Sequence, residues 1–343
     1  YYHNKAYDKC VSHYNICLSG QYKPTTTPLK ILDVHHSLEG MGGPFDGCKT
    51  AYAFLLTTDN YLPGLLTTIH HLRKHATEPH DYVVIVTPEV TEQVRQVLYQ
   101  FCVIVRETAV IRNPYRFVDW IDKWRKTLFT KLAVWMLVEY DKVLYVDADM
   151  GVMKSFDDLF QWEVHSGEIS AGAYSYKEQN YLGTYSFLIK PSVETFDHLV
   201  KEATQAYAKK RKTWDMSDVG FLTEFFQKSW GTNPSLRWPW GTFTVNDDIT
   251  SVGTLALDTI NKTSHGFKFT ARSSKPWLSA LHNFKDDPDL LVILKKWWAQ
   301  YYEMTDREIP DTIDMYSLLE FSEYDLYWRQ MYATTRSRKW IGR

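Results

Sequence analysis

The sequence predicts an α/β domain built on a parallel, doubly wound sheet with helices on both faces. Two observations predict this fold. Short apolar runs, typical of buried parallel strands, alternate along the chain with longer helical segments. The run Lys142 to Val146 leads directly into the acidic residue Asp147, and in open α/β sheets ligands bind beyond the carboxyl ends of the strands. With 343 residues, 44% of them hydrophobic, the chain can bury a large core.

The elements follow in order from Ala51. The residues before it are rich in Tyr, His, Thr, Pro and Gly and end in the breaker cluster 40–44, so we interpret 1–50 as an N-terminal extension or stem. Apolar runs predict strands at 51–56, 82–86, 103–105, 142–146 and 186–189. Helical patterns predict helices at 63–75, 91–101, 120–140, 193–209, 218–229 and 288–302. The last residues, 303–343, mix Leu, Tyr, Trp and Arg at helical spacing and predict a C-terminal helical appendage.

The charge balance excludes one class of partner. A formal net charge of −2 results from 39 basic and 41 acidic side chains spread along the whole chain. No global field therefore attracts nucleic acid or an anionic membrane, and we expect no nucleic-acid partner.

The cysteines bear on the cellular compartment. Cys10, Cys17, Cys48 and Cys102 form no CxxC pair and fit no zinc site. A disulfide between Cys10 and Cys17 would staple a loop-like stretch, and residues 261–263 (NKT) form a glycosylation sequon. Together they favour the secretory-pathway lumen, Golgi or ER, with the cytoplasm as the alternative. The C-terminal tail and the stem leave open a peripheral or stem-anchored membrane association.

Asp147 and Asp149, separated by Ala148, follow the fourth apolar run directly. At the exit of a strand the chain leaves extended geometry, so both carboxylates can turn toward one cation. A hard divalent ion such as Mn²⁺ or Mg²⁺ prefers oxygen ligands and completes its shell with substrate phosphates. The alternative is a solvated turn with two chance acids, and only the surrounding sequence separates the two readings.

That surrounding sequence resembles glycosyltransferase family 8, the glycogenin-like family. The segment 142–160, KVLYVDADMGVMKSFDDLF, is similar to the family's DxD region, including the helix that follows it. Further similar segments occur in the family's order over about residues 51–302: AFLLTTDNYLPG, FTKLAVW, PSVETF, SDVGFLTEFF, SSKPW and LKKWW. The resemblance implies a GT-A (Rossmann-like) fold with a mixed, mainly parallel sheet, and a single catalytic domain over 51–302. It also implies a UDP-sugar donor, a metal held at the DxD motif and transfer with retention of anomeric configuration.

Matching positions imply roles for single residues. Lys131 would reach the diphosphate or the donor sugar, and Asp147, Ala148 and Asp149 would lie against the metal and the diphosphate. The same matching implies that four residues hold the uridine: Leu56, Thr58, Asp59 and Tyr61. Gly183 and Thr184 fall in the segment that contacts the sugar, and Lys275 and Trp277 would close over the phosphates.

Asp215 and Asp218 fall where family members have acids that contact the donor sugar, and Asp218 is the better candidate for the carboxylate on its β face. A carboxylate there either forms a transient covalent adduct or stabilises an oxocarbenium-like state while the acceptor attacks from the leaving-group side. A helix N-cap at Ser217 or Asp218 is the competing structural reading.

The sequence also departs from the family pattern. The family's Asn-Ser-Gly segment is replaced by Gly183-Thr184-Tyr185, and Val219 stands where a Gln is usual. The third metal ligand, normally a His before the KPW lysine, is replaced by Phe269 or Lys268, with His265 and His282 as alternatives. If Lys268 takes that place, its ammonium stands in for part of the metal's charge.

Two other functions remain open from the sequence. The first is a catalytically impaired relative that binds nucleotide or glycan as a scaffold, because the sugar-contacting segment and the His are changed. The second is a phosphatase of the haloacid dehalogenase type, which also has a DxD motif after a strand. Gly151 disfavours it, because a Thr or Val is expected there. For a transferase, the acceptor is a glycan, a lipid or a protein.

Overall fold

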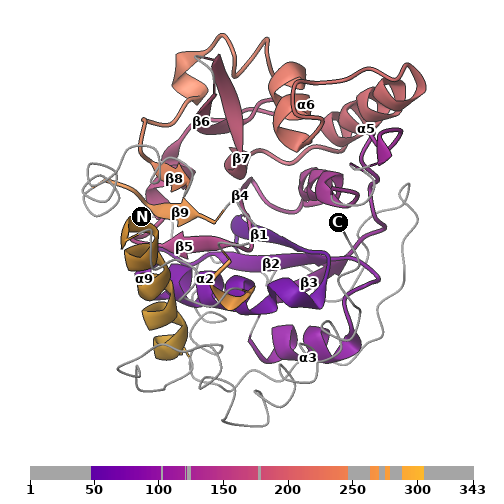
Figure 1. Cartoon of the computed structure of the whole chain (residues 1–343). Helices are drawn as coiled ribbons and strands as arrows, with labels where there is room; N and C mark the ends of the chain where they lie inside the picture. The colour runs from indigo at the N-terminus through magenta and orange to yellow at the C-terminus, as the bar shows by residue number, and fades with distance from the viewer. Residues whose placement is uncertain are drawn as a thin grey trace.

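The computed structural model describes residues 48–304, except for 102, 120, 122–124, 177–178, 246–262, 270–274 and 279–287 (Figure 1). The predicted extension up to residue 47, the tail from 305, Cys10, Cys17, Cys102 and His282 therefore lie outside the described residues, as do two of the three sequon positions. Among the described helices, none has the length and apolar character needed to cross a membrane.

The central sheet has six strands in the order β3-β2-β1-β4-β7-β6. Strands β3, β2, β1 and β4 run parallel, which confirms the predicted parallel sheet in this half. β7 pairs antiparallel with β4, and β6 antiparallel with β7, so the complete sheet is mixed. The alternation of strands and helices did not predict this antiparallel half. The strands are β1 (Thr50–Leu56), β2 (Asp81–Val86), β3 (Ile104–Glu107), β4 (Lys142–Val146), β6 (Ser170–Tyr176) and β7 (Gln179–Ile189).

Alternating side chains of β1 enter two different cores. Ala51 and Ala53 belong to one hydrophobic cluster, whereas Tyr52, Phe54 and Leu56 belong to the other. Because strand side chains alternate between faces, this split shows that both faces of the sheet are covered. One face is covered by α2 (Leu62–His75) and α3 (Glu92–Gln100), and the other by the 3-10 helix η2 (Leu128–Met136), α5 (Val193–Ala208) and α6 (Asp218–Phe225). Figure 1 shows these helices on opposite sides of the parallel strands.

The predicted helices are confirmed with changed bounds, except the one over 120–140. Side-chain caps start three of them: Thr91, Ser192 and Ser217 each accept a hydrogen bond from a backbone N–H of the first turn. The helix predicted over 120–140 is wrong in type, because its described core is the 3-10 helix η2. Residues 129–135 are all buried there. The segment therefore packs on all sides and lacks the single apolar face of an amphipathic α-helix. The helix predicted over 218–229 ends at Phe225.

A second, three-stranded sheet was not predicted. Its order is β5-β9-β8, formed by β5 (Met150–Val152), β9 (Gly266–Lys268) and β8 (Phe243–Val245). Strands of three residues are too short to show an alternating pattern. Beside this sheet lies α9 (Pro288–Met304), which packs on α2. The buried cluster between them includes Phe267, Trp277 and Trp297. Four short 3-10 helices complete the described elements: η1 (Asp59–Tyr61), η3 (Asp157–Gln161), η4 (Pro234–Leu236) and η6 (Pro276–Leu278).

Candidate active site

The candidate site lies where the strand order reverses. From β1 the chain adds β2 and β3 on one side, and then β4 on the other side of β1. The carboxyl ends of β1 and β4 are therefore neighbours, and the segments after them flank the switch point at which open α/β sheets bind ligands. The predicted uridine residues lie at the end of β1 and just after it, and the DxD motif follows β4. The fold thus brings both ends of the predicted donor site together.

The DxD motif connects the two sheets. Asp147 follows β4, and its backbone N–H donates to the carbonyl of Tyr185 on β7 at 2.8 Å. Asp149 precedes β5, and its carbonyl accepts from Phe269 N–H at 3.1 Å. The side chain of Asp149 is 7% exposed and that of Asp147 is 18% exposed. Both carboxylates are therefore fixed by sheet pairing in a buried setting.

Two lysines from the late part of the chain lie on these carboxylates. Lys268 Nζ contacts Asp147 Oδ2 at 2.6 Å and also donates to Asp149 Oδ1. Lys275 Nζ donates to Asp149 Oδ2 and to the carbonyl of Phe269. The side chain of Phe269 lies in the hydrophobic cluster under α9. Of the alternatives left open by the sequence, Lys268 therefore occupies the place beside the DxD motif.

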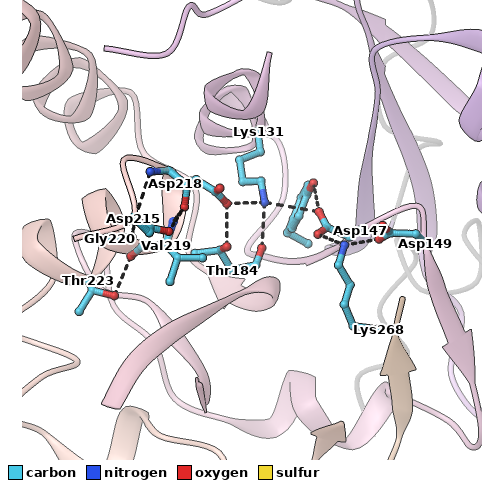
Figure 2. A network of polar contacts seen from close by, with 12 residues as sticks. Lys131, Asp147, Asp149, Thr184, Asp215, Asp218, Val219, Gly220, Thr223 and Lys268 are labelled. Carbon is cyan, nitrogen blue, oxygen red and sulfur yellow. Dashed lines mark hydrogen bonds and ion pairs between the residues drawn. The ribbon is translucent and has the colours of Figure 1, made fainter. Parts of the chain in front are cut away.

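Lys131 joins the DxD motif to the second acidic position (Figure 2). Its Nζ lies 2.7 Å from Asp218 Oδ2 and 3.4 Å from Asp147 Oδ1, and it donates to the carbonyl of Thr184 at 3.1 Å. The hydroxyl of Thr184 also donates to Asp218 Oδ2, at 2.6 Å. Buried between two acids, Lys131 holds two carboxylates that are 71 positions apart in the sequence in one network.

Asp215 lies beside this network but is turned away from Lys131. Its Oδ1 accepts from the N–H groups of Ser217 and Gly220, both at 3.1 Å, and its Oδ2 accepts from the Ser217 hydroxyl. These are the free N–H groups at the start of α6, where a carboxylate is stabilising. The structure therefore brings Asp218, but not the carboxylate of Asp215, to Lys131.

The charges of the network are mutually maintained. Burial alone would raise the pKa of Asp147, but the ammonium groups of Lys131 and Lys268 hold the pKa of that carboxyl well below its usual range. Burial would lower the pKa of Lys268, yet Asp147 and Asp149 raise the pKa of its amine above the ordinary value. For Lys131 the same opposition, against Asp147 and Asp218, also raises the pKa. Lys275 differs, because burial outweighs Asp149 and lowers the pKa of its amine.

The predicted uridine segment meets the KPW segment directly. Trp277 Nε1 donates to the carbonyl of Asn60 at 2.9 Å, and the Trp277 ring lies edge-on to Tyr61 with centroids 5.9 Å apart. A Cβ on Gly64 would lie 2.3 Å from the Trp277 ring and 2.6 Å from the carbonyl oxygen of Ala148. Only glycine permits this approach. Leu56 is buried at the end of β1, Thr58 is exposed, and Asp59 Oδ1 accepts from Thr91 N–H at 3.0 Å.

The residues at the DxD motif do not fit a bound divalent cation. All four carboxylate oxygens of Asp147 and Asp149 already accept hydrogen bonds, from Tyr145, Lys268 and Lys275. The position expected to provide a third ligand carries an amine that donates only. Within the described ranges, one group of three His, Cys, Asp or Glu residues has its ligand atoms close together. It consists of His70 and His71 on α2 and Glu303 on α9, and does not include the DxD motif.

The other predicted metal ligand that can be located is engaged elsewhere. His265 Nε2 lies 2.7 Å from Asp158 Oδ1. His265 precedes β9, whereas Lys268, the last residue of β9, contacts the DxD carboxylates. Asp158 belongs to the DDLF segment. The sequence missed Tyr145, whose hydroxyl donates to Asp147 Oδ1 at 2.6 Å. The strand pattern alone could have found it, because Tyr145 lies two positions before Asp147.

The mixed sheet, with the candidate site at its switch point, has the GT-A fold. Residues 53–216 match the model of Glycosyl transferase family 8. This match confirms the family resemblance inferred from the sequence.

Individual relatives agree with this family. The chain is 26% identical to glycogenin of Komagataella phaffii, over 73% of this chain and 64% of the relative. It is 25% identical to galactinol synthase 2 of Solanum lycopersicum, over 72% and 78% of the two chains. Human glycogenin-1 is 30% identical over 53% and 49%. The matches thus span about half to four-fifths of these relatives' own lengths.

A solved structure supports the fold. The galactosyltransferase LgtC, in complex with donor and acceptor sugar analogues, superposes with a TM-score of 0.51 at 15% sequence identity. The superposition covers 76% of this chain and 98% of LgtC. At this level of identity the likeness concerns the fold alone.

Proposed function

We propose that this protein is a retaining glycosyltransferase that moves a sugar from a UDP-sugar to an acceptor hydroxyl. The observation that carries the proposal is the network at the switch point, in which Lys131 joins Asp147 of the DxD motif to Asp218. A nucleotide diphosphate sugar needs cationic groups at its phosphates and an anionic group near its anomeric carbon. The network offers both within a few ångströms, and the family match supports the reaction class.

The contacts of Asp218 favour charge stabilisation over nucleophilic attack. One of its oxygens accepts from Thr184 and is paired with Lys131. A carboxylate held by an ammonium and a hydroxyl is a weakened nucleophile but still stabilises a neighbouring positive charge. In the proposed reaction the bond from the anomeric carbon to the diphosphate oxygen breaks and the bond to the acceptor oxygen forms. The hydroxyl proton leaves with the diphosphate, and Asp218 stabilises the oxocarbenium-like state between these events.

Lys131 would act at the leaving group. Its buried ammonium is kept charged by Asp147 and Asp218, so it needs no reorganisation when the diphosphate gains charge. The KPW segment, closed on the loop after β1 through Trp277, would exclude water from the same bond.

The test is a screen of UDP release from a panel of UDP-sugars with the purified protein, using Asp218→Asn as the inactive reference. We expect one UDP-sugar to be hydrolysed or transferred well above the Asp218→Asn rate, and the anomeric configuration of the product to match that of the donor. Specific UDP binding without any turnover would instead support the scaffold function that the changed Gly183-Thr184-Tyr185 segment left open.

The acceptor of the proposed transfer also needs a binding surface. A glycan, lipid or protein hydroxyl remains the proposed acceptor. Trp240 is 71% exposed and Trp214 is 42% exposed, and Trp214 packs on Tyr181 with centroids 4.4 Å apart. Exposed tryptophan faces suit sugar rings. These two residues are therefore the first to substitute when an acceptor is sought.

We also propose that the protein works in the secretory-pathway lumen. The support is Cys48, which is disulfide-bonded, because structural disulfides persist in oxidising compartments. The Cys10–Cys17 pairing predicted from the sequence stays a prediction, as does a peripheral or stem-anchored membrane association. Mass spectrometry of the non-reduced protein would identify the partner of Cys48.

A further inference from the structure

We propose that Lys268, together with Lys275, supplies in this chain the positive charge that a divalent metal supplies at a DxD motif, so that donor binding and transfer need no metal. The inference rests on the proposed function, because it concerns how the same site holds a UDP-sugar. It is carried by the contacts of the two lysines with Asp147 and Asp149.

Lys268 occupies the position of a bridging cation. Lys268 Nζ lies between the two carboxylates, with one oxygen of each as its partner (Figure 2). A cation that bridges both aspartates is the arrangement a DxD motif provides for a metal. Here an ammonium of the chain itself occupies the bridging place.

The two lysines also match the two aspartates in charge. Asp147 and Asp149 carry two negative charges, and the ammonium groups of Lys268 and Lys275 carry two positive charges. The motif is therefore neutralised within the chain. A divalent cation would have to displace both amines from the carboxylates and then lie beside them in a setting where the lysine side chains are only 13% and 3% exposed.

The backbone fixes Lys268 in this place. In the β5–β9 pairing Lys268 lies opposite Met150, the residue after Asp149. A Cβ on Gly151 would lie 2.2 Å from the Phe267 ring, and one on Gly266 would lie 2.4 Å from the Gly151 carbonyl oxygen. The two glycines and Phe267 interlock the strands. Since a shift of one residue would turn Lys268 to the other face, this register determines which side chain meets the carboxylates.

A functional role follows for the incoming donor. The diphosphate brings negative charge to a site in which two ammonium groups are already oriented and largely desolvated. Such charge-assisted contacts to phosphate are strong, although a lysine is a point charge without the fixed geometry of a metal shell. When the diphosphate binds, Lys268 and Lys275 can share their donors between the aspartates and the phosphate oxygens.

The experiment measures UDP affinity by calorimetry, and UDP-sugar turnover, in EDTA and in excess Mn²⁺. For the wild type we expect the dissociation constant and the turnover rate to change by less than about threefold between the two conditions. A loss of about tenfold or more in EDTA would overturn the inference while leaving the proposed function intact. Absence of UDP binding in both conditions would overturn the proposed function itself, and the inference with it.

A substitution at Lys268 tests the inference more directly. Lys268→His restores the residue type that the family resemblance expects, and it should create metal dependence: UDP affinity falls by about tenfold or more in EDTA and recovers with Mn²⁺. The matched control is Lys201→His on the exposed surface of α5, which should show no difference between the conditions. Lys268→His that binds UDP equally well with and without Mn²⁺ would contradict the inference.

A measurement on the wild type alone keeps the test independent of that variant's folding. Calorimetric titration of Mn²⁺ into the protein without nucleotide should give no binding at the DxD motif. Because His70, His71 and Glu303 form a second candidate cluster, the titration is repeated on His70→Ala to remove that signal. Tight Mn²⁺ binding that persists in His70→Ala would refute the role of Lys268.

Discussion

At the scale of single residues, the site depends on buried charges that support one another. Lys131 is charged because Asp147 and Asp218 surround it, and Asp147 is charged because Lys131 and Lys268 surround it. Removing one member of such a set leaves its partner buried without compensation, which costs more than the pair contributes. Conservative substitutions are therefore the informative ones.

The two acidic positions before and within α6 should separate cleanly. Asp218→Asn keeps the size of the side chain but removes the charge beside Lys131, so we expect the rate of UDP release to fall by about 100-fold or more. Asp215→Asn weakens the contacts at the start of α6, so we expect a stability loss of about 1–2 kcal/mol with the rate nearly unchanged. UDP release at saturating donor and urea unfolding measure the two effects.

This pair contains its own control, because each change removes one carboxylate near the start of α6. A rate loss in Asp215→Asn equal to that in Asp218→Asn would show that Asp215 acts on the donor, as the sequence also allowed.

At the scale of elements, Asp157 fastens η3 to the segment after α2. Its buried carboxylate accepts from the hydroxyl of Tyr52 at 2.6 Å, from the hydroxyl of Thr77 at 2.9 Å and from Glu78 N–H at 3.1 Å, and His80 Nε2 lies 3.3 Å away. Asp157 is the first residue of the DDLF segment, which resembles the family's sequence. This residue thus has a structural role.

We expect Asp157→Asn to destabilise the fold by about 2–3 kcal/mol at pH 7. Burial opposes the effect, but the nearby His80 ring and the hydrogen bonds from Tyr52 and Thr77 hold the pKa of Asp157 well below its ordinary value of 3.8. A pKa lowered by folding contributes stability that is present above the unfolded pKa and is lost as the pH falls through the folded pKa. The difference between wild type and Asp157→Asn in urea unfolding should therefore shrink from pH 7 to pH 3. A difference that is equal at both pH values would contradict this account.

The interlock of β5 with β9 gives a second prediction at this scale. Gly151→Ala places a methyl group into the Phe267 ring, so we expect a loss of about 1–3 kcal/mol and weaker UDP binding, because Lys268 moves with β9. Gly172→Ala on β6 is the matched control, since its Cβ would meet no atom closer than 4.0 Å. Unfolding and UDP calorimetry on both variants test this, and equal effects in the two would argue against the interlock.

Sequence patterns predicted elements in proportion to their length. The strands of the parallel half and the helices α2, α3 and α5 were placed to within a few residues, because apolar runs and helical patterns are local signals. The short strands β5, β8 and β9 and the antiparallel direction of β7 were missed, because only pairing with distant residues defines them. For the same reason the sequence could not choose between Lys268 and Phe269, since the β5–β9 register decides which side chain meets Asp149.

At the scale of the whole molecule, the site is assembled from segments far apart in the chain. The loop after β1, the DxD motif and the KPW segment meet through Trp277, Asn60 and Gly64. The family motifs predicted that these segments share a site. They did not predict that Lys131 joins the DxD motif to Asp218, because that depends on how η2 packs against β7 and α6.

Closure of this assembly should be measurable as ligand-induced stability. Trp277→Phe keeps an aromatic ring but loses the hydrogen bond to Asn60, so we expect UDP affinity to fall by about fivefold. UDP then raises the melting temperature less than in the wild type at equal concentration. The control is Trp298→Phe, since Trp298 is buried in the same cluster but its indole nitrogen makes no hydrogen bond within the described part of the chain. Equal effects of the two substitutions would show that packing, not closure, is measured.

The pairing of β5 with β9 also determines where the site's cation comes from. A metal ion is exchanged with the surroundings, so its occupancy follows the concentration of free metal and the presence of competing chelators. An ammonium on a strand that is paired with the DxD segment has an effective concentration fixed by the fold. On the proposal made for Lys268, the cation is part of the polypeptide and needs no loading step. Activity would then be independent of the manganese concentration in the compartment where the protein works.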